Sequence, residues 1–343
     1  MSDATDVVGY DATEEFFGRQ TPLKRLQGVL HAYPWLSPMF VLVFVVVVFS
    51  TISSNFSQAS NLGTITQQTA VVGTLAIGQT IIILTAGIDL SCGAIMVFTQ
   101  MVMAKSAFSS GVPAIPALLL GIAVGVLAGL ANGFLVTKVK LPPFIVTLGT
   151  FLIFTALTLL YATGREVRSA ELAKPLKWLG HRINIGEFRL TSGVLLMLVL
   201  YIIFAYVLRY TSWGTHVYAV GDDPDAARLA GIRSTRVVLS VYVVAGLIFG
   251  IAGWLLIGRV QTASPNSGID ANLDSITAVV IGGTSLFGGR GRVFGSLIGA
   301  LIVATVDNGL SVAGIDQAYK NLFIGILIVG AVTADQWIRK ARS

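Results

Sequence analysis

The sequence predicts an all-α membrane protein that crosses the bilayer about ten times. Only 12% of the 343 residues are charged, whereas soluble domains average roughly 25%. The mean hydropathy is +0.80, and long apolar runs recur between short polar segments. Because backbone polar groups in lipid must be satisfied internally, we expect these runs to be helices.

The chain divides into a membrane domain and two tails. Residues 1–30 are polar, and their acidic start lacks the basic region of a cleavable signal peptide, so we interpret them as a cytoplasmic tail. Residues 31–338 form the membrane domain, and the basic residues 339–343 form a second cytoplasmic tail. The predicted spans are residues 38–52, 63–85, 95–108, 113–136, 144–161, 193–208, 237–257, 275–287, 294–310 and 322–337.

The distribution of Lys and Arg residues predicts how these spans are oriented across the membrane. With both termini inside, the tails and residues 138–140, 209–236 and 290–292 are cytoplasmic and hold most of the basic residues, as the positive-inside rule requires. The exception is residues 164–190, a basic loop that the span count places outside. We keep this orientation because the rule is weakest for long loops.

A short internal similarity suggests that the two halves of the domain are equivalent. Residues 131–136 resemble residues 307–312, and both contain an Asn-Gly pair, at Asn132 and at Asn308. The fourth and ninth spans would then correspond, five spans apart, so the halves would run in opposite directions. Inverted repeats of this kind place a transport pathway at their interface, which makes both asparagines candidate pathway residues.

Residues 209–236 form a charged interval between two apolar runs and contain a compact helix. Asp223 is a good N-cap, Pro224 suits the first helical position, and Gly231 is placed to end the helix after Ala230. At roughly 10 Å this helix is too short to span a bilayer. Two interpretations stay open, an amphipathic loop between spans and a docking helix that a soluble partner grips.

On the docking interpretation, small side chains give this helix a smooth face. Ala226, Ala227 and Ala230 would enter a groove of the partner, and Arg228 would add a salt bridge. An exposed salt bridge is worth only about 0–1 kcal/mol, so the face should matter more than the charge.

Asp89 is the most unusual residue, because an ionisable group at the centre of a membrane helix costs at least about 2.5 kcal/mol. It lies between Gly87 and Ser91, where a new helix is expected to begin. We favour a helix-capping role for its carboxylate. A direct role of Asp89 and Ser91 in a transport pathway is the alternative.

Residues 281–292 are rich in glycine but lack the Gly-Lys-Ser/Thr ending of a phosphate-binding loop, so nucleotide binding is not expected. Gly282, Gly283 and Thr284 are candidates for a helix break or for the pathway. The three histidines lie far apart, and the single cysteine, Cys92, excludes an internal disulfide. We therefore predict no metal site, no cofactor and no catalytic residues on this chain.

Three segments together resemble one protein family. They are Thr-Ala-Gly-Ile-Asp-Leu-Ser at 85–91, Gly-Asp-Asp-Pro-Asp-Ala-Ala-Arg-Leu-Ala-Gly-Ile at 221–232, and Ala-Val-Val-Ile-Gly-Gly-Thr-Ser-Leu-Phe-Gly-Gly at 278–289. In this order they are similar to the bacterial monosaccharide permeases of binding-protein-dependent ABC importers, which include ribose, xylose, arabinose, galactose and fructose permeases. The similarity covers nearly the whole chain after the first tail. Cys92 stands where the family often has Val.

The resemblance implies a homodimer in the bacterial inner membrane that imports a monosaccharide. Its partners would be an ABC ATPase that holds ATP and Mg, as two copies or one fused double domain, and a periplasmic sugar-binding protein. The segment from Asp222 to Gly231 matches the cytoplasmic coupling helix that seats in the ATPase. No nucleic acid is implied. Residues 164–190 and 258–274 are expected to face the binding protein.

Two rival functions remain. An ABC permease for branched-chain amino acids would share the architecture but match the three segments less well. An ion-coupled secondary transporter usually carries several ionisable residues within its spans. Here Asp89, Asp274 and Asp307 are the only acids near a span, which disfavours that rival.

Overall fold

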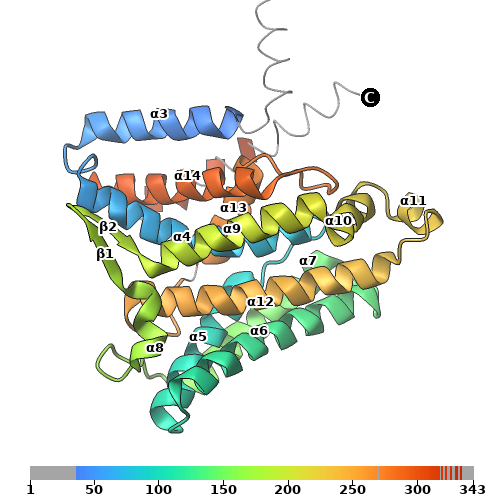
Figure 1. The fold of residues 1–343 in the computed structure, drawn as a ribbon, viewed down its shortest axis with the longest axis horizontal. Coiled ribbons are helices and arrows are strands. Elements are labelled where there is room, and N and C mark those ends of the chain that lie inside the picture. Colours follow the sequence, from blue (N-terminus) through green and yellow to red (C-terminus); the bar gives the residue numbers. More distant parts are fainter. Residues whose placement is uncertain are drawn as a thin grey trace, which may run out of the picture.

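Long apolar helices lie side by side through most of the chain, and shorter polar elements sit at the two ends of the bundle (Figure 1). The computed structural model describes residues 36–316 except 269, together with residues 318–319, 321–322, 325–326, 329–330 and 333. The all-α membrane fold is confirmed. The helices long and apolar enough to cross a membrane are α4 (Ala59–Leu84), α5 (Cys92–Ser109), α6 (Ala114–Thr137), α7 (Pro143–Ala162), α9 (Ser192–Tyr210), α12 (Ser234–Val260) and α14 (Val293–Val312).

Two shorter apolar helices complete the described bundle. They are α3 (Leu36–Ile52) and α13 (Ala271–Ile281). These nine helices follow the order of the first nine predicted spans. The tenth predicted span falls mostly outside the described residues, as do both predicted tails, so the count of ten stays a prediction.

The bounds of the eighth span were wrong. The helix begins at Ala271 and ends at Ile281, earlier at both ends than the predicted residues 275–287. The early end follows from Gly282 and from Gly283, which adopts a left-handed φ of +82°. The apolar residues beyond it, up to Phe287, belong to a tight connection rather than to a span.

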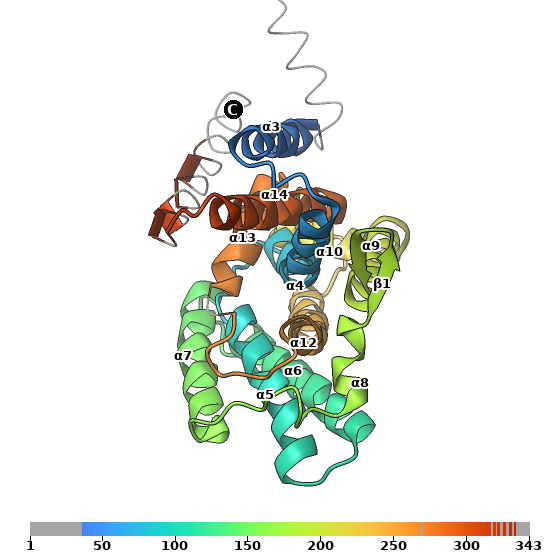
Figure 2. The same cartoon turned by 90° about the vertical axis from the view of Figure 1, so that its left-hand side faces the viewer.

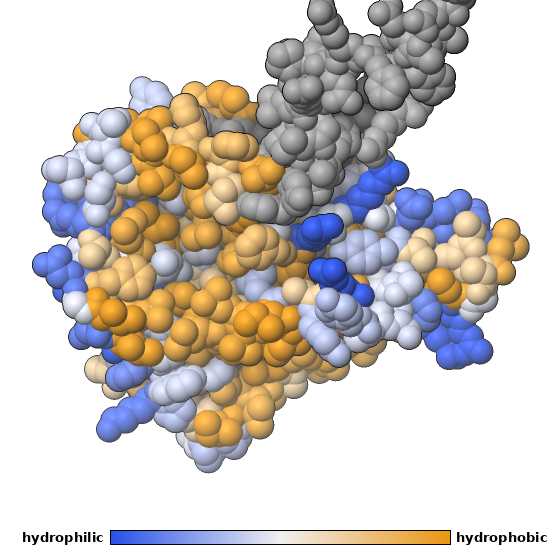
Figure 3. Space-filling view, turned by 45° about the horizontal axis from the view of Figure 1, so that its top comes forward, coloured by the Kyte–Doolittle hydropathy of each residue, from blue (hydrophilic) through white to orange (hydrophobic). Residues whose placement is uncertain are grey.

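Two antiparallel helices, α4 and α12, form the centre of the bundle (Figure 2). The most apolar stretch of α4 is 89% buried, whereas that of α7 is only 22% buried. The outer helices expose Leu, Ile and Phe side chains instead. Figure 3 shows hydrophobic side chains over the broad middle of one face and hydrophilic ones toward its ends, as a surface that faces lipid requires.

The helix contacts occur in matched pairs. Helix α6 packs along α12 and α14 packs along α4, while α5 packs on α6 and α13 packs on α14. In the same way α5 contacts α12 and α13 contacts α4. Since α4 and α12 run in opposite directions (Figure 1), this pattern supports the predicted inverted repeat, with α6 and α14 as equivalents.

Glycine allows the closest of these contacts. A Cβ atom at Gly129 of α6 would lie 2.2 Å from the carbonyl oxygen of Tyr242, and one at Gly246 of α12 would lie 2.2 Å from the carbonyl oxygen of Gly125. The two helix backbones therefore touch directly, as small residues permit in membrane proteins.

The segment predicted as a long polar loop is folded. It contains α8 (Lys174–Lys177), the 3-10 turn η1 (Trp178–Gly180) and an antiparallel hairpin of β1 (Arg182–Ile185) and β2 (Phe188–Thr191). Leu172, Leu176 and Leu179 bury their side chains, which explains why this loop is ordered.

A second connection packs against this folded loop. Val167 pairs with Ala263 across an antiparallel bridge, and the hydroxyl of Ser264 donates a hydrogen bond to the Glu166 carboxylate. Residues 164–191 and 261–268 therefore form one surface, which we call the outer platform after the orientation predicted from the sequence. It lies at the opposite end of the bundle from α11 (Pro224–Leu229) (Figure 1).

Candidate functional site

Two helices, not one, occupy the charged interval 209–236. The first, α10 (Ser212–Asp222), was not predicted. The Thr211 hydroxyl caps it by accepting a hydrogen bond from the backbone N–H of Gly214 at 3.2 Å. Its signals were present in the sequence, because Thr211 is a capping residue and Trp213, Val217 and Val220 recur at helical spacing.

The second helix, α11, has the predicted termini. One Asp223 oxygen accepts hydrogen bonds from the backbone N–H groups of Asp225 and Ala226, each at 2.9 Å, and Pro224 is the first helical residue. The helix ends at Leu229 with Ala230 as its cap, and Gly231 follows with a left-handed φ of +84°. The predicted short capped helix is therefore confirmed.

The exposed face of α11 differs from the predicted one. Ala227 is only 4% exposed and packs into the main hydrophobic core, so it cannot line an outward alanine face with Ala226 and Ala230, which are exposed. Arg228 lies 3.3 Å from Asp225 within the same helix. Leu229, at 87% exposure, is the most exposed large hydrophobic side chain of the described residues, and it was not predicted from the sequence.

The end of α10 is pressed against the end of α4. A Cβ atom at Gly221 would lie 1.7 Å from the carbonyl oxygen of Leu84, so only glycine fits there. That oxygen also accepts a hydrogen bond from the backbone N–H of Gly289 at 3.0 Å. A Cβ atom at Gly288 would lie 2.6 Å from the oxygen of Gly221 and 2.9 Å from the nitrogen of Ala86.

The structure thus brings together the three segments that were singled out in the sequence. Residues 84–86, 221–222 and 288–289 meet in direct backbone contact, and we call this contact the three-segment junction. Asp222, the last residue of α10, lies in it beside Gly289. A single residue, Asp223, connects the junction to the exposed helix α11.

Asp89 lies a few residues beyond the junction, in the break between α4 and α5. It is 1% exposed, and one carboxylate oxygen accepts hydrogen bonds from the backbone N–H and the hydroxyl of Ser91, at 2.7 and 2.5 Å. The Asn132 amide donates to the same Ser91 hydroxyl at 2.9 Å. Asp89, Ser91 and Asn132 therefore form one buried cluster at the start of α5.

Side chains from three spans fix the backbone of this break. Gln79 of α4 donates to the carbonyl oxygen of Asp89 at 2.9 Å, Thr147 of α7 to that of Ile88 at 3.0 Å, and Asn272 of α13 to that of Leu90 at 3.2 Å. These three residues were not predicted from the sequence. Their signal was the placement of amide and hydroxyl groups inside apolar helices, which is costly unless they find partners.

The other candidate residues lie elsewhere. The Asn308 carbonyl accepts a hydrogen bond from Asn61 at 2.8 Å, at the end of α4 remote from Asp89, so the two asparagines of the repeat do not share one site. Gly282 packs on Gly295 in the tight hairpin between α13 and α14, where a Cβ atom would lie 2.4 Å from the Gly295 oxygen. Thr284 is buried in the same hairpin.

Comparison with known proteins identifies the family. A model described as the permease component of branched-chain amino acid transport systems matches residues 61–332. The fructose import permease of Rhizobium meliloti is 46% identical over 341 residues, which cover 98% of this chain and 93% of the relative. The ribose import permease of Bacillus subtilis is 37% identical, with 92% and 97% covered, and the D-allose permease of Escherichia coli is 33% identical, with 88% and 91% covered.

The chain belongs to the monosaccharide ABC importer permeases. No solved structure matches it. The permease is a multi-pass inner-membrane subunit of a sugar importer, a transport component rather than an enzyme. Among the residues that the structure describes, no group of three His, Cys, Asp or Glu side chains is arranged to hold a metal ion.

Replacing Asp89 of the permease by asparagine is expected to leave transport largely intact. The N-cap residue of α5 is Ser91 rather than the predicted Asp89, and an asparagine carbonyl at position 89 can still accept both hydrogen bonds of Ser91. Asp89→Ala would leave both Ser91 donors without this acceptor, at about 1–3 kcal/mol for each buried group, and should lower the amount of folded protein. Sugar uptake and the membrane level of each variant check this. Loss of uptake in Asp89→Asn at a normal membrane level would show that the negative charge itself acts in transport.

Proposed function

We propose that this permease translocates a monosaccharide across the inner membrane, driven by ATP that a separate ABC ATPase hydrolyses. The observation that carries the proposal is the three-segment junction. It ties an exposed helix, α11, by backbone contacts to the breaks that separate α4 from α5 and α13 from α14. A force applied to α11 therefore acts directly on the helix ends inside the bundle.

In this mechanism α11 seats in a groove of the ATPase. Leu229 enters the groove, and Ala226 and Ala230 allow the helix to approach closely, while ATP and Mg remain on the ATPase. When the ATPase pair closes, α10 moves with α11. Gly221 then carries the movement to Leu84 and Gly289, because no side chain separates these backbones. The permease itself needs no cofactor.

The remaining partners are a second permease and a periplasmic sugar-binding protein. We assign the binding protein to the outer platform, which is at the far end of the bundle from α11. The pathway would run at the interface of the two inverted halves, as the internal similarity of the sequence predicts. Asp89 and Asn132 would act as positioning residues, because both hydrogen-bond to Ser91 at the break between α4 and α5.

A monosaccharide is favoured over a branched-chain amino acid as the substrate. The family description names amino-acid transport, but the relatives that match over nearly their full length are named for fructose, ribose and allose. The identity of the sugar is expected to depend largely on the binding protein that delivers it.

Reconstitution tests the proposal. The permease, its ATPase and its binding protein would be placed in liposomes, and uptake of fructose, ribose, allose and leucine would be measured. We expect uptake of one sugar that requires ATP and persists when an uncoupler removes the ion gradients. Uptake that follows an ion gradient without ATP would favour a secondary transporter, and stimulation by leucine alone would favour an amino-acid permease.

The same proposal orients the permease in the membrane. In a Cys92→Ala background, Glu187→Cys at the tip of the hairpin should react with an impermeant maleimide in intact spheroplasts. Asp225→Cys on α11, also exposed, should react only after lysis. The reverse pattern would show that the outer platform faces the cytoplasm.

A further inference from the structure

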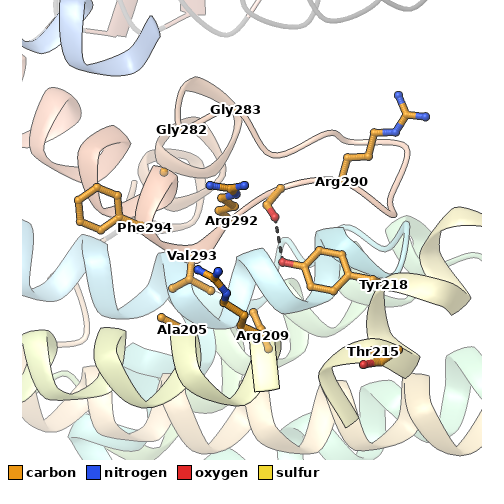
Figure 4. Close-up of a pocket in the computed structure, with 13 residues that line it drawn as sticks. Ala205, Arg209, Thr215, Tyr218, Gly282, Gly283, Arg290, Arg292, Val293 and Phe294 are labelled. Atoms are coloured by element: carbon orange, nitrogen blue, oxygen red, sulfur yellow. Dashed lines mark hydrogen bonds between the residues drawn. The ribbon is translucent and has the colours of Figure 1, made fainter. Parts of the chain in front are cut away.

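A large cavity that the transport mechanism does not use lies between the end of α9, α10 and the loop that leads into α14. Its volume is about 820 Å³. It is lined by Ala205, Leu208, Arg209, Thr215, Tyr218, Gly282, Gly283, Arg290, Gly291, Arg292, Val293, Phe294 and Gly295 (Figure 4). Three of these residues are arginines, and none of them is acidic.

The guanidinium groups of Arg209 and Arg292 line the cavity from opposite sides. Arg209 rises from the last turn of α9 toward the loop that carries Arg292, while Arg290 points away along that loop (Figure 4). No ion pair joins any of the three to an acidic residue within the described part of the chain. Arg209 and Arg292 are both exposed and carry like charges, which an anion lying between them would neutralise.

The loop that positions Arg292 is held in place. The Tyr218 hydroxyl donates a hydrogen bond to the carbonyl oxygen of Gly291 at 2.9 Å. Burial raises the pKa of Tyr218, against the smaller opposing effect of the Arg292 charge, so the hydroxyl stays protonated and remains a donor at neutral pH. Helix α14 begins directly after Arg292, and its amino terminus adds partial positive charge.

Apart from the arginines, Thr215 and Tyr218, the side chains of the cavity lining are apolar, and they lie next to exposed apolar residues of α9. Leu208 and Val293 line it, and Phe294 is 51% exposed at its edge. Along α9, leading away from the cavity, Ile202 is 70% exposed and Tyr206 is 61% exposed. A ligand that suits this site therefore has an anionic group for the arginines and an apolar portion for the adjoining helix surface.

We propose that this cavity binds the phosphate group of an anionic phospholipid, with Arg209 and Arg292 as its ligands and the acyl chains along Phe294 and the exposed face of α9. The charge and the position at the end of two membrane helices both fit such a lipid. A free phosphate shares the anionic chemistry but leaves the apolar surface unused. Arginine suits the role because its planar fork can donate two hydrogen bonds to one phosphate.

Native mass spectrometry of the full-length permease in detergent tests the proposal. Dioleoyl phosphatidylglycerol and dioleoyl phosphatidylcholine would each be titrated into the wild type and into an Arg209→Gln/Arg292→Gln variant. The matched control is Arg182→Gln/Arg189→Gln, which removes two exposed arginines from the hairpin of the outer platform. We expect the wild type and the control to retain phosphatidylglycerol in preference to phosphatidylcholine. The cavity variant should bind phosphatidylglycerol at least about tenfold more weakly, since it loses two charge-assisted contacts.

Each other result overturns the proposal. Equal binding of the two lipids would mean that the acyl chains alone are recognised. Unchanged phosphatidylglycerol binding in the cavity variant would place the site elsewhere. Displacement of phosphatidylglycerol by millimolar inorganic phosphate would identify a site for the free anion. If the double variant does not purify as a monodisperse protein, Arg292→Gln alone, which keeps the hydrogen bond from Tyr218 to Gly291, is titrated in its place with the same criteria.

Discussion

Replacing Gly221 by alanine is expected to abolish ATP-driven sugar uptake while leaving the ATPase bound. The new Cβ atom would lie 1.7 Å from the carbonyl oxygen of Leu84, so one of the two backbones must move. Overpacking of this kind costs about 1–3 kcal/mol, and it falls on the contact that joins α10 to α4. Helix α11, which carries the proposed ATPase contact, is unchanged. The measurements are uptake in proteoliposomes, sugar-stimulated ATP hydrolysis and co-purification of the ATPase.

The control for this experiment is Gly149→Ala in α7. A Cβ atom there meets no other atom within 4 Å, and alanine favours a helix more than glycine does. We expect the control to transport at the wild-type rate. Normal uptake by Gly221→Ala would show that the three-segment junction does not transmit the movement.

Replacing Leu229 by aspartate is expected to release the ATPase from a permease that folds normally. This contrasts with Gly221→Ala, which should keep the ATPase bound. Leu229 is 87% exposed, so its replacement disturbs no internal contact. Burying a leucine in a partner is worth about 1.5–3 kcal/mol, which corresponds to roughly a 10- to 150-fold change in affinity. Co-purification of the ATPase and titration of purified ATPase onto the permease in nanodiscs measure the effect.

Variants of two neighbouring residues in α11 serve as comparisons for Leu229→Asp. Arg228→Ala removes only an exposed ion pair with Asp225, so its effect on ATPase affinity should be within a few-fold. Ala227→Trp should reduce the amount of folded permease, since Ala227 is 4% exposed and packs in the core. Wild-type ATPase affinity in Leu229→Asp would exclude α11 as the principal contact.

The features that the sequence predicted are those with local causes. The N-cap at Asp223, the proline after it and the glycine at 231 act within one helical turn, and the structure has all three in the predicted roles. The apolar runs likewise specify membrane helices from composition alone. The bounds of α13 were wrong because Phe287 continues an apolar run that Gly283 had already ended.

The features that were missed depend on residues far apart in the chain. Which face of α11 is buried is decided by the core beneath it, so alanines at 226, 227 and 230 look alike in sequence. The outer platform owes its order to leucines in a polar stretch and to a bridge between Val167 and Ala263. The junction is invisible in sequence because Gly221 is required by Leu84, a residue on another helix.

The glycine contacts between α6 and α12 join these two helices into one rigid pair. Where backbones touch at Gly125, Gly129 and Gly246, there are no long side chains to change rotamer and absorb a displacement. Helix α12 follows α11 almost directly, and its 27 residues extend for roughly 40 Å. At its far end Gly258 touches Gly180 of the outer platform, again backbone to backbone. We therefore expect a displacement of α11 to be transmitted along α12 to the outer platform, so that the two ends of the permease move together.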